Sequence, residues 1–212
     1  MTRSDGHVRG KILRFPIESV PKRGFQRAKP LRGDRIEDPG QLDLFARPGA
    51  EVIPFPARKS PFDEALALDE AEDDRAVEFY ERAIRTDDRA ADAYCNLGIL
   101  RFREDQASEA FDCFTRSLEL DPRHFESHYN LGNLYFDAED LRLAKLHYEI
   151  AAELEPSFPN VYFNLGLVQA VGENFHAAIE ALTSYRDLAS EEELVVAEEL
   201  LKTVQALAFA RN

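Results

Sequence analysis

The chain has 212 residues, 44% of them hydrophobic, and a formal net charge of -14 at pH 7. This length accommodates one domain plus an appendage, and the hydrophobic share is sufficient for a core. The negative charge argues against non-specific binding to nucleic acid or to an anionic membrane, and no apolar run approaches the about 20 residues of a membrane helix.

The charge is divided unevenly along the chain. Residues 1–60 hold 13 Lys and Arg against 7 Asp and Glu, whereas residues 61–212 hold 13 against 33. A basic tail therefore precedes a strongly acidic body. The two cysteines, Cys95 and Cys113, lack the spacing of a disulfide framework or a metal site, and no signal peptide is visible. We expect reduced thiols and a cytoplasmic protein.

The tail, residues 1–60, is rich in proline and shows neither helical nor strand periodicity, so we predict that it is disordered. Three apolar clumps interrupt it, at Ile12–Pro16, Gln41–Phe45 and Val52–Pro56. Apolar anchors in an extended, proline-rich chain are typical of short linear motifs, because little ordering entropy is lost on docking.

The middle clump resembles a known motif. Gln41, Leu42, Asp43, Leu44 and Phe45 are similar, at all five positions, to the pentapeptide with which bacterial polymerases and repair proteins bind the sliding clamp. The resemblance implies that Gln41 meets a polar subsite while Leu44 and Phe45 fill an apolar pocket. A competing interpretation is that this clump, or Val52–Phe55, docks onto the acidic body of the same chain.

The body repeats itself every 34 residues. YCNLGILRF begins at Tyr94, HYNLGNLYF at His128 and YFNLGLVQA at Tyr162. Glycine in mid-helix costs about 1 kcal/mol relative to alanine, a cost that is explained if a second helix packs too close for a Cβ atom. Inside these stretches the repeated glycines are Gly98, Gly132 and Gly166. Beyond them the repeated positions are Ala110, Ala144 and Ala178, and the helix-ending Pro122 and Pro156.

This pattern resembles the tetratricopeptide repeat family, which implies an all-α helical solenoid of antiparallel helix pairs. We predict nine helices: a degenerate repeat at 57–90, with Glu64 in the glycine position, repeats at 91–124, 125–158 and 159–192, and a capping helix at 193–212. The repeat domain as a whole is expected to span 61–192. Leu200 and Leu207 widen the apolar face of the capping helix, which leaves room for a homodimer contact.

The resemblance also implies a concave surface that grips a peptide of a partner protein. Asn96, Asn130 and Asn164 form a ladder of amides at the 34-residue interval, and an amide can both donate to and accept from a peptide backbone. The alternative is that these asparagines serve the scaffold alone. The other candidates for this surface, whose aromatic members fit a groove floor or the core, are Ile99, Phe102, Arg103, Tyr129, Asn133, Phe136, Phe163 and Leu167.

The charges of the candidates indicate the kind of partner. Arg103 is the one cation among them, which argues against the carboxylate clamp of chaperone-binding relatives. The acidic body favours an apolar or basic segment instead.

We expect no cofactor, no metal and no catalysis, because nucleophile–base pairs and metal spacings are missing. His124 and His128 are four residues apart, but His128 takes the packing position of Tyr94 and Tyr162.

We therefore predict a cytoplasmic adaptor or scaffold for protein–protein interaction. Two alternatives remain at this point. One is an accessory factor of DNA replication or repair that is tethered to the sliding clamp through Gln41–Phe45. The other is a regulatory protein related to bacterial transcription regulators that carry such repeats. Direct binding to nucleic acid or to a membrane is not expected, since the tail carries a charge of only +6.

Overall fold

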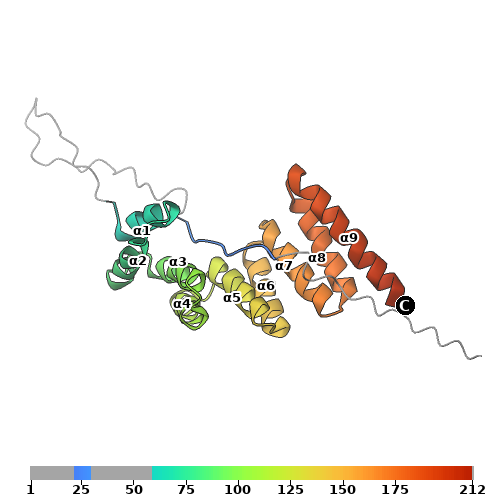
Figure 1. The fold of residues 1–212 in the computed structure, drawn as a ribbon, viewed down its shortest axis with the longest axis horizontal. Helices are drawn as coiled ribbons and strands as arrows, with labels where there is room; N and C mark the ends of the chain where they lie inside the picture. The colour runs from blue at the N-terminus through green and yellow to red at the C-terminus, as the bar shows by residue number, and fades with distance from the viewer. Residues whose placement is uncertain (1–21, 30–58, 212) are drawn as a thin grey trace, which may run out of the picture. The chain divides into compact units, whose positions relative to one another are not determined.

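The computed structural model describes residues 22–29 and 59–211. Within these residues every regular element is an α-helix, which confirms the predicted all-α solenoid of nine helices (Figure 1). No helix in this part of the chain is long and apolar enough to cross a membrane. The helices are α1 (Pro61–Glu70), α2 (Ala76–Arg85), α3 (Ala90–Arg103), α4 (Ala107–Leu120), α5 (Phe125–Asp137), α6 (Leu141–Leu154), α7 (Pro159–Val171), α8 (Phe175–Leu188) and α9 (Glu191–Arg211).

The described residues form two compact units. The N-terminal unit contains residues 26–29 and 59–130, and the C-terminal unit contains residues 22–25 and 131–211. Their boundaries fall inside α5 and between Phe25 and Gln26, so the short segment 22–29 contributes to both.

The mid-helix glycines lie where a second helix packs closely, as the sequence predicted. A Cβ on Gly98 would lie 2.7 Å from the Phe114 ring of α4, and one on Gly132 would lie 2.6 Å from the Tyr148 ring of α6. The neighbour is thus the large residue of the partner helix. The repeated alanines of these helices are also buried, one turn earlier.

The helix ends follow from local sequence. α4 and α6 each stop two residues before a proline, Pro122 and Pro156, because the residue before proline disfavours the helical conformation. Asp121 and Glu155, which precede these prolines, accordingly have non-helical backbone angles. At the start of α9, the carboxylate of Glu193 accepts hydrogen bonds from the hydroxyl and the backbone N–H of Ser190, so the first turn of this helix is capped.

Each unit has its own apolar core. In the N-terminal unit, α1, α2 and α3 bury a cluster around Phe62 and Tyr80. In the C-terminal unit, α9 packs on α8 and buries Leu200 and Leu207 within the chain itself. These two leucines, on which the expectation of a homodimer rested, are therefore already covered. The large apolar side chains that α9 leaves exposed are Val195, Val196 and Phe209.

Candidate peptide-binding site

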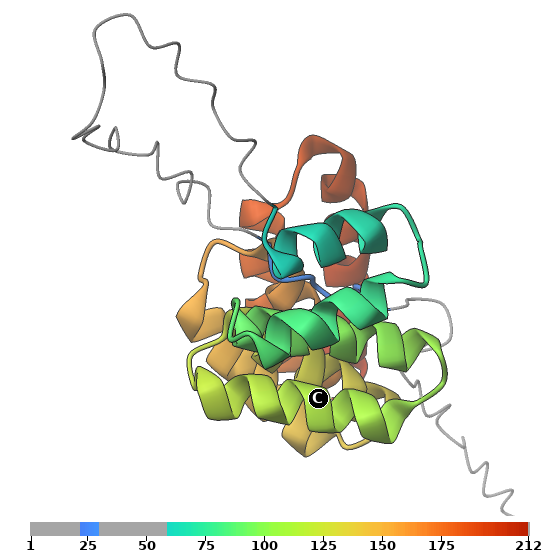
Figure 2. The same cartoon turned by 90° about the vertical axis from the view of Figure 1, so that its left-hand side faces the viewer.

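The sequence KRGFQRAK, residues 22–29, lies against the helices as an open, non-helical stretch (Figures 1 and 2). It belongs to the tail for which we predicted disorder, and that prediction does not describe these eight residues. The segment holds four Lys and Arg and no acidic residue. Pro21 and Pro30 flank it, so every residue inside it keeps its backbone N–H.

In the N-terminal unit, two asparagines hold the backbone of this segment. The Asn96 side chain accepts a hydrogen bond from the N–H of Ala28 at 2.8 Å and donates one to the carbonyl of the same residue at 3.0 Å. Asn130 does the same with Gln26, at 2.7 Å and 2.8 Å. Each amide therefore satisfies both polar groups of one residue, as adjacent strands do in a sheet.

In the C-terminal unit, the third asparagine repeats this arrangement. Asn164 accepts from the N–H of Arg23 at 2.7 Å and donates to its carbonyl at 3.1 Å. Asn133, another candidate, instead supports its neighbours: its Oδ1 atom accepts from the Asn164 amide at 2.8 Å and from the Tyr148 hydroxyl at 2.6 Å. All four asparagines are at most 1% exposed.

The ladder is held in place from behind. The amide of Asn96 also donates to the hydroxyl of Tyr80 at 3.2 Å, and that of Asn130 to the sulfur of Cys95 at 3.3 Å. Burial raises the pKa of the Cys95 thiol to about 12, so the sulfur is a neutral thiol at physiological pH. These second contacts fix the rotamers of the asparagines and leave their oxygens directed at the segment.

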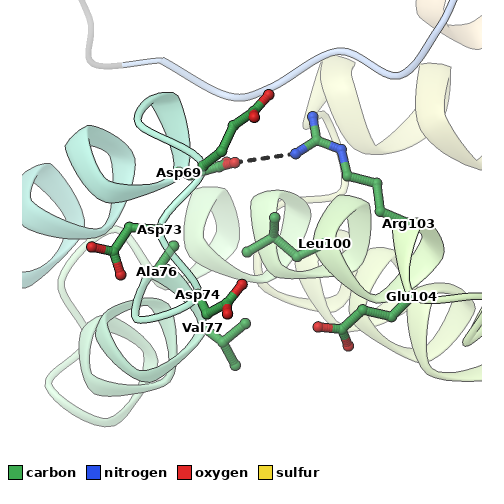
Figure 3. Close-up of a pocket in the computed structure, with 9 residues that line it drawn as sticks. Asp69, Asp73, Asp74, Ala76, Val77, Leu100, Arg103 and Glu104 are labelled. Carbon is green, nitrogen blue, oxygen red and sulfur yellow. Dashed lines mark hydrogen bonds and ion pairs between the residues drawn. The ribbon is translucent and has the colours of Figure 1, made fainter.

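Arg27 occupies a subsite built around a buried carboxylate in the N-terminal unit. Its Nη2 atom lies 2.5 Å from Oδ1 of Asp69, whose side chain is 1% exposed. Arg103 approaches the same oxygen at 3.3 Å, and the hydroxyl of Tyr80 donates to the other oxygen at 3.2 Å. Figure 3 shows Asp69 and Arg103 directed at one another beside the ribbon of the segment. Burial and the charge of Asp69 raise the pKa of Tyr80 above its ordinary value.

Arg23 occupies a different subsite in the C-terminal unit. Its guanidinium lies 4.7 Å from the centre of the Phe163 ring, donates to the hydroxyl of Tyr185 at 2.5 Å, and pairs with Glu193 at 3.1 Å. Partial burial opposes the charged form of Glu193, but hydrogen bonds from Ser190 and the charge of Arg23 outweigh it and lower its pKa. Lys22 pairs with Asp137 nearby, at 3.2 Å.

The remaining candidates lie in several environments. Arg103 is exposed, and it reaches the segment's subsite through Asp69 rather than through the backbone. The guanidinium of Arg23 lies over the ring of Phe163. Phe102 and Phe136 are half-buried, whereas Ile99, Tyr129 and Leu167 are buried in the helical framework. Sequence reasoning missed Asp69, Tyr185 and Glu193, although the charge contrast between tail and body pointed to acidic partners.

The segment Gln41–Phe45, which resembles the sliding-clamp motif, lies outside the described residues, as do the clumps at Ile12–Pro16 and Val52–Pro56.

The two histidines have local structural roles. His128 shares a hydrogen bond of 3.2 Å with the carbonyl of Pro122, as the hydroxyl of Tyr162 does with Pro156 one repeat later. His124 accepts from the N–H of Ser127 at the start of α5, and its other ring nitrogen lies 2.8 Å from Asp92. Over residues 22–29 and 59–211, no group of three or more His, Cys, Asp or Glu side chains is arranged to hold a metal ion.

Comparisons with known proteins agree with this architecture. Residues 91–124 and residues 129–193 match two family models that are both described as tetratricopeptide repeat. No curated protein matches the sequence. The chain is similar to the solved structure of YrrB, described as a TPR protein with an unusual peptide-binding site, at 22% identity and a TM-score of 0.60, over 72% of this chain and 78% of that one.

Two further structures share the fold. A crystal structure of MamA protein is 20% identical, with a TM-score of 0.61 over 71% of this chain and 82% of that one. The first TPR of Spaghetti (RPAP3), bound to an HSP90 peptide, is 24% identical, with a TM-score of 0.50 over 56% and 95%. With the matched residues, the interhelix glycines and the all-α architecture together, residues 91–124 and 129–193 of this chain are tetratricopeptide repeats.

Proposed function

We propose that this chain is a non-catalytic adaptor that binds an extended peptide of a partner protein through Asn96, Asn130 and Asn164. One observation carries the proposal: each of these asparagines makes both of its available backbone hydrogen bonds to a single residue of the segment 22–29. The segment supports the proposal as an example of such a ligand, because it is an open chain whose N–H groups at Arg23, Gln26 and Ala28 donate to the asparagines.

Scaffold support alone does not account for these contacts. Oδ1 of Asn96 and of Asn130 accepts hydrogen bonds from backbone N–H groups of the segment. The burial of these acceptors includes the cover that the segment itself provides, so each bond to its backbone contributes about 0.5–1.5 kcal/mol relative to a bond with water. The bonds of the three asparagines together favour occupation by a peptide backbone. The peptide-binding site described for YrrB and the HSP90 peptide bound to Spaghetti (RPAP3) support the same role.

The test requires a protein whose own segment cannot occupy the surface. In the full-length variant Gln26→Pro/Ala28→Pro, here termed the released variant, two N–H donors of the segment are missing, while every helix residue is unchanged. We expect a fluorescein-labelled peptide with the sequence of residues 20–31 to bind the released variant with micromolar affinity. Fluorescence anisotropy measures this binding, and circular dichroism checks that helix content is preserved.

The control lies in the asparagines. On the background of the released variant, Asn130→Ala should weaken binding of the peptide at least about tenfold, because one residue of the peptide loses both hydrogen bonds. Asn174→Ala should have no effect, since Asn174 is exposed and makes no capping hydrogen bond. A released variant that is folded but does not bind the peptide would refute the proposed function.

A second function is proposed for the tail, on the match of all five positions of Gln41–Phe45 to the sliding-clamp motif. Burial of anchors of this size is worth roughly 1.5–3 kcal/mol each before the ordering cost, which corresponds to micromolar binding. We expect calorimetric titration of the full chain into a bacterial sliding clamp to give micromolar binding, and the variant Leu44→Ala/Phe45→Ala to give none. Equal heats from both proteins would exclude the motif.

A further inference from the structure

The helices recognise the side chains of the segment 22–29 as well as its backbone. The two arginines are the side chains that they recognise most specifically. We propose that the adaptor selects extended basic peptides of the pattern Arg-x-x-x-Arg-small, and that its own residues 22–29 are a built-in competitor for such a partner. This inference rests on the proposed function, since it names the ligand of the same surface.

The subsite of Arg27 is selective for a guanidinium. Oδ1 of Asp69 is buried and already faces Arg103, so the incoming cation has to reach the carboxylate along a fixed direction. Arg27 reaches this oxygen through Nη2, and a guanidinium, which is more weakly hydrated than an ammonium group, is the cation better suited to an ion pair with a buried carboxylate. Because the remaining oxygen of Asp69 is taken by the Tyr80 hydroxyl, a neutral side chain at this position leaves the carboxylate with less charge compensation.

The subsite of Arg23 is selective for the same group by other means. The guanidinium lies over the Phe163 ring and near the Tyr185 ring, at 4.7 Å and 5.7 Å from their centres, while its N–H groups reach an hydroxyl and the carboxylate of Glu193. Stacking on aromatic faces combined with a carboxylate partner is a combination that arginine provides and lysine does not.

The residue after the second arginine has to be small. Ala28 is 1% exposed, and both of its backbone groups are bonded to Asn96, so a longer side chain at this position would displace the backbone from the asparagine. Gly24 and Lys29 carry no such restriction on the size of the side chain. A Cβ added at Gly24 would meet no atom within 4 Å, and the side chain of Lys29 is exposed.

Covalent attachment makes the segment an effective competitor. A ligand joined covalently to its site acts at an effective concentration of about a millimolar. If the free peptide binds with micromolar affinity, the attached segment occupies the surface most of the time. A partner with the same pattern then binds the wild-type chain at least about tenfold more weakly than it binds a chain whose segment is disabled.

Labelled peptides of residues 20–31 test both parts. The wild-type peptide should bind the released variant at least about tenfold more tightly than it binds the wild-type protein. Against the released variant, the peptides with Arg27→Gln or Arg23→Gln should lose about tenfold to a hundredfold in affinity. The peptide with Lys29→Gln also loses one positive charge and is the matched control; it should lose less than about twofold. The peptide with Ala28→Leu should bind as weakly as the arginine variants.

The outcomes separate this inference from the function on which it rests. Tight binding that does not distinguish Arg27→Gln from Lys29→Gln would leave the adaptor intact and overturn the arginine pattern. Equal affinity for the wild-type protein and the released variant would overturn the built-in competitor. Failure of every peptide to bind the folded released variant would overturn the proposed function together with this inference.

Discussion

Replacing Gly132 with valine should lower the free energy of unfolding by about 3 kcal/mol, because valine inserts atoms where the neighbouring helix leaves no room. A single Cβ at this position would lie 2.6 Å from two carbon atoms of the Tyr148 ring and 3.0 Å from a third. Thermal unfolding followed by circular dichroism should show a midpoint about 6–12 °C lower than that of the wild type.

The Tyr148 ring has little freedom to move aside. It is fully buried, and its hydroxyl donates to Asn133 at 2.6 Å. A rotation that relieved the overlap would break this bond and disturb Asn133, which in turn orients Asn164. The cost of the valine therefore spreads from the packing of α5 and α6 to one of the asparagines of the candidate site.

Gly24→Val is the matched control, since a Cβ on Gly24 meets no atom within 4 Å. Its melting temperature should equal that of the wild type. If Gly132→Val also melted like the wild type, the glycine would serve no packing role, and its recurrence at the 34-residue interval would need another explanation.

Much of the fold was predictable because the repeat imposes the same packing several times. Gly98 and Gly132 each indicate a closely packed partner helix, and in the structure an aromatic ring lies against each of them. The spacing of the asparagines likewise indicated an amide ladder, since residues 34 apart occupy equivalent positions on successive first helices. The structure places this ladder on a peptide backbone.

The identity of that backbone was harder to predict. We assigned possible docking to the apolar clumps, whereas the described contacts belong to a basic stretch with a single large apolar residue, Phe25. Ion pairs such as Arg27 with Asp69 join residues 42 positions apart. The tail has no sequence periodicity from which such a pairing could be predicted. The available signal was compositional: residues 22–29 hold four of the tail's positive charges, no acid and no proline.

Asp69 was missed for a different reason, which is that it lies in the degenerate repeat. It corresponds to Arg103 in the next repeat, 34 residues later, so the repeat pattern does not mark it as special. Its role arises from the inversion of charge between the two positions, which lets one repeat supply a carboxylate and the next a guanidinium that bind each other.

Asp69→Asn should lower the free energy of unfolding by about 3 kcal/mol and release the segment, although the two side chains have the same shape. The carboxylate accepts from Arg27 and Arg103 through one oxygen and from Tyr80 through the other. An amide has one acceptor oxygen, so it can serve the arginines or the tyrosine but not both, and its NH2 group repels a guanidinium. Hydrogen bonds to a charged group contribute about 1.5–3 kcal/mol each.

The loss should extend to the ladder. Because the Tyr80 hydroxyl donates to Asp69, its oxygen is free to accept from Asn96. Reorienting Tyr80 removes that support from the amide that holds Ala28. We therefore expect the backbone amides of Gln26 and Ala28 to lose protection in hydrogen exchange followed by NMR. Asp74 lines the same surface pocket as Asp69 but is exposed (Figure 3), so Asp74→Asn removes a negative charge there and should change neither stability nor exchange.

Retention of full amide protection in Asp69→Asn would show that Asn96 and Asn130 hold the segment without help from the arginine subsite. The backbone ladder would then be sufficient for binding, and the surface would accept many sequences with free N–H groups. Loss of protection with the global fold intact would show instead that charge recognition and backbone recognition are coupled through Tyr80. In that case a partner without an arginine at this position would lose both the ion pair and the backbone hydrogen bonds. The reason is that the Asp69 carboxylate, which attracts the arginine, also orients the Asn96 amide through Tyr80.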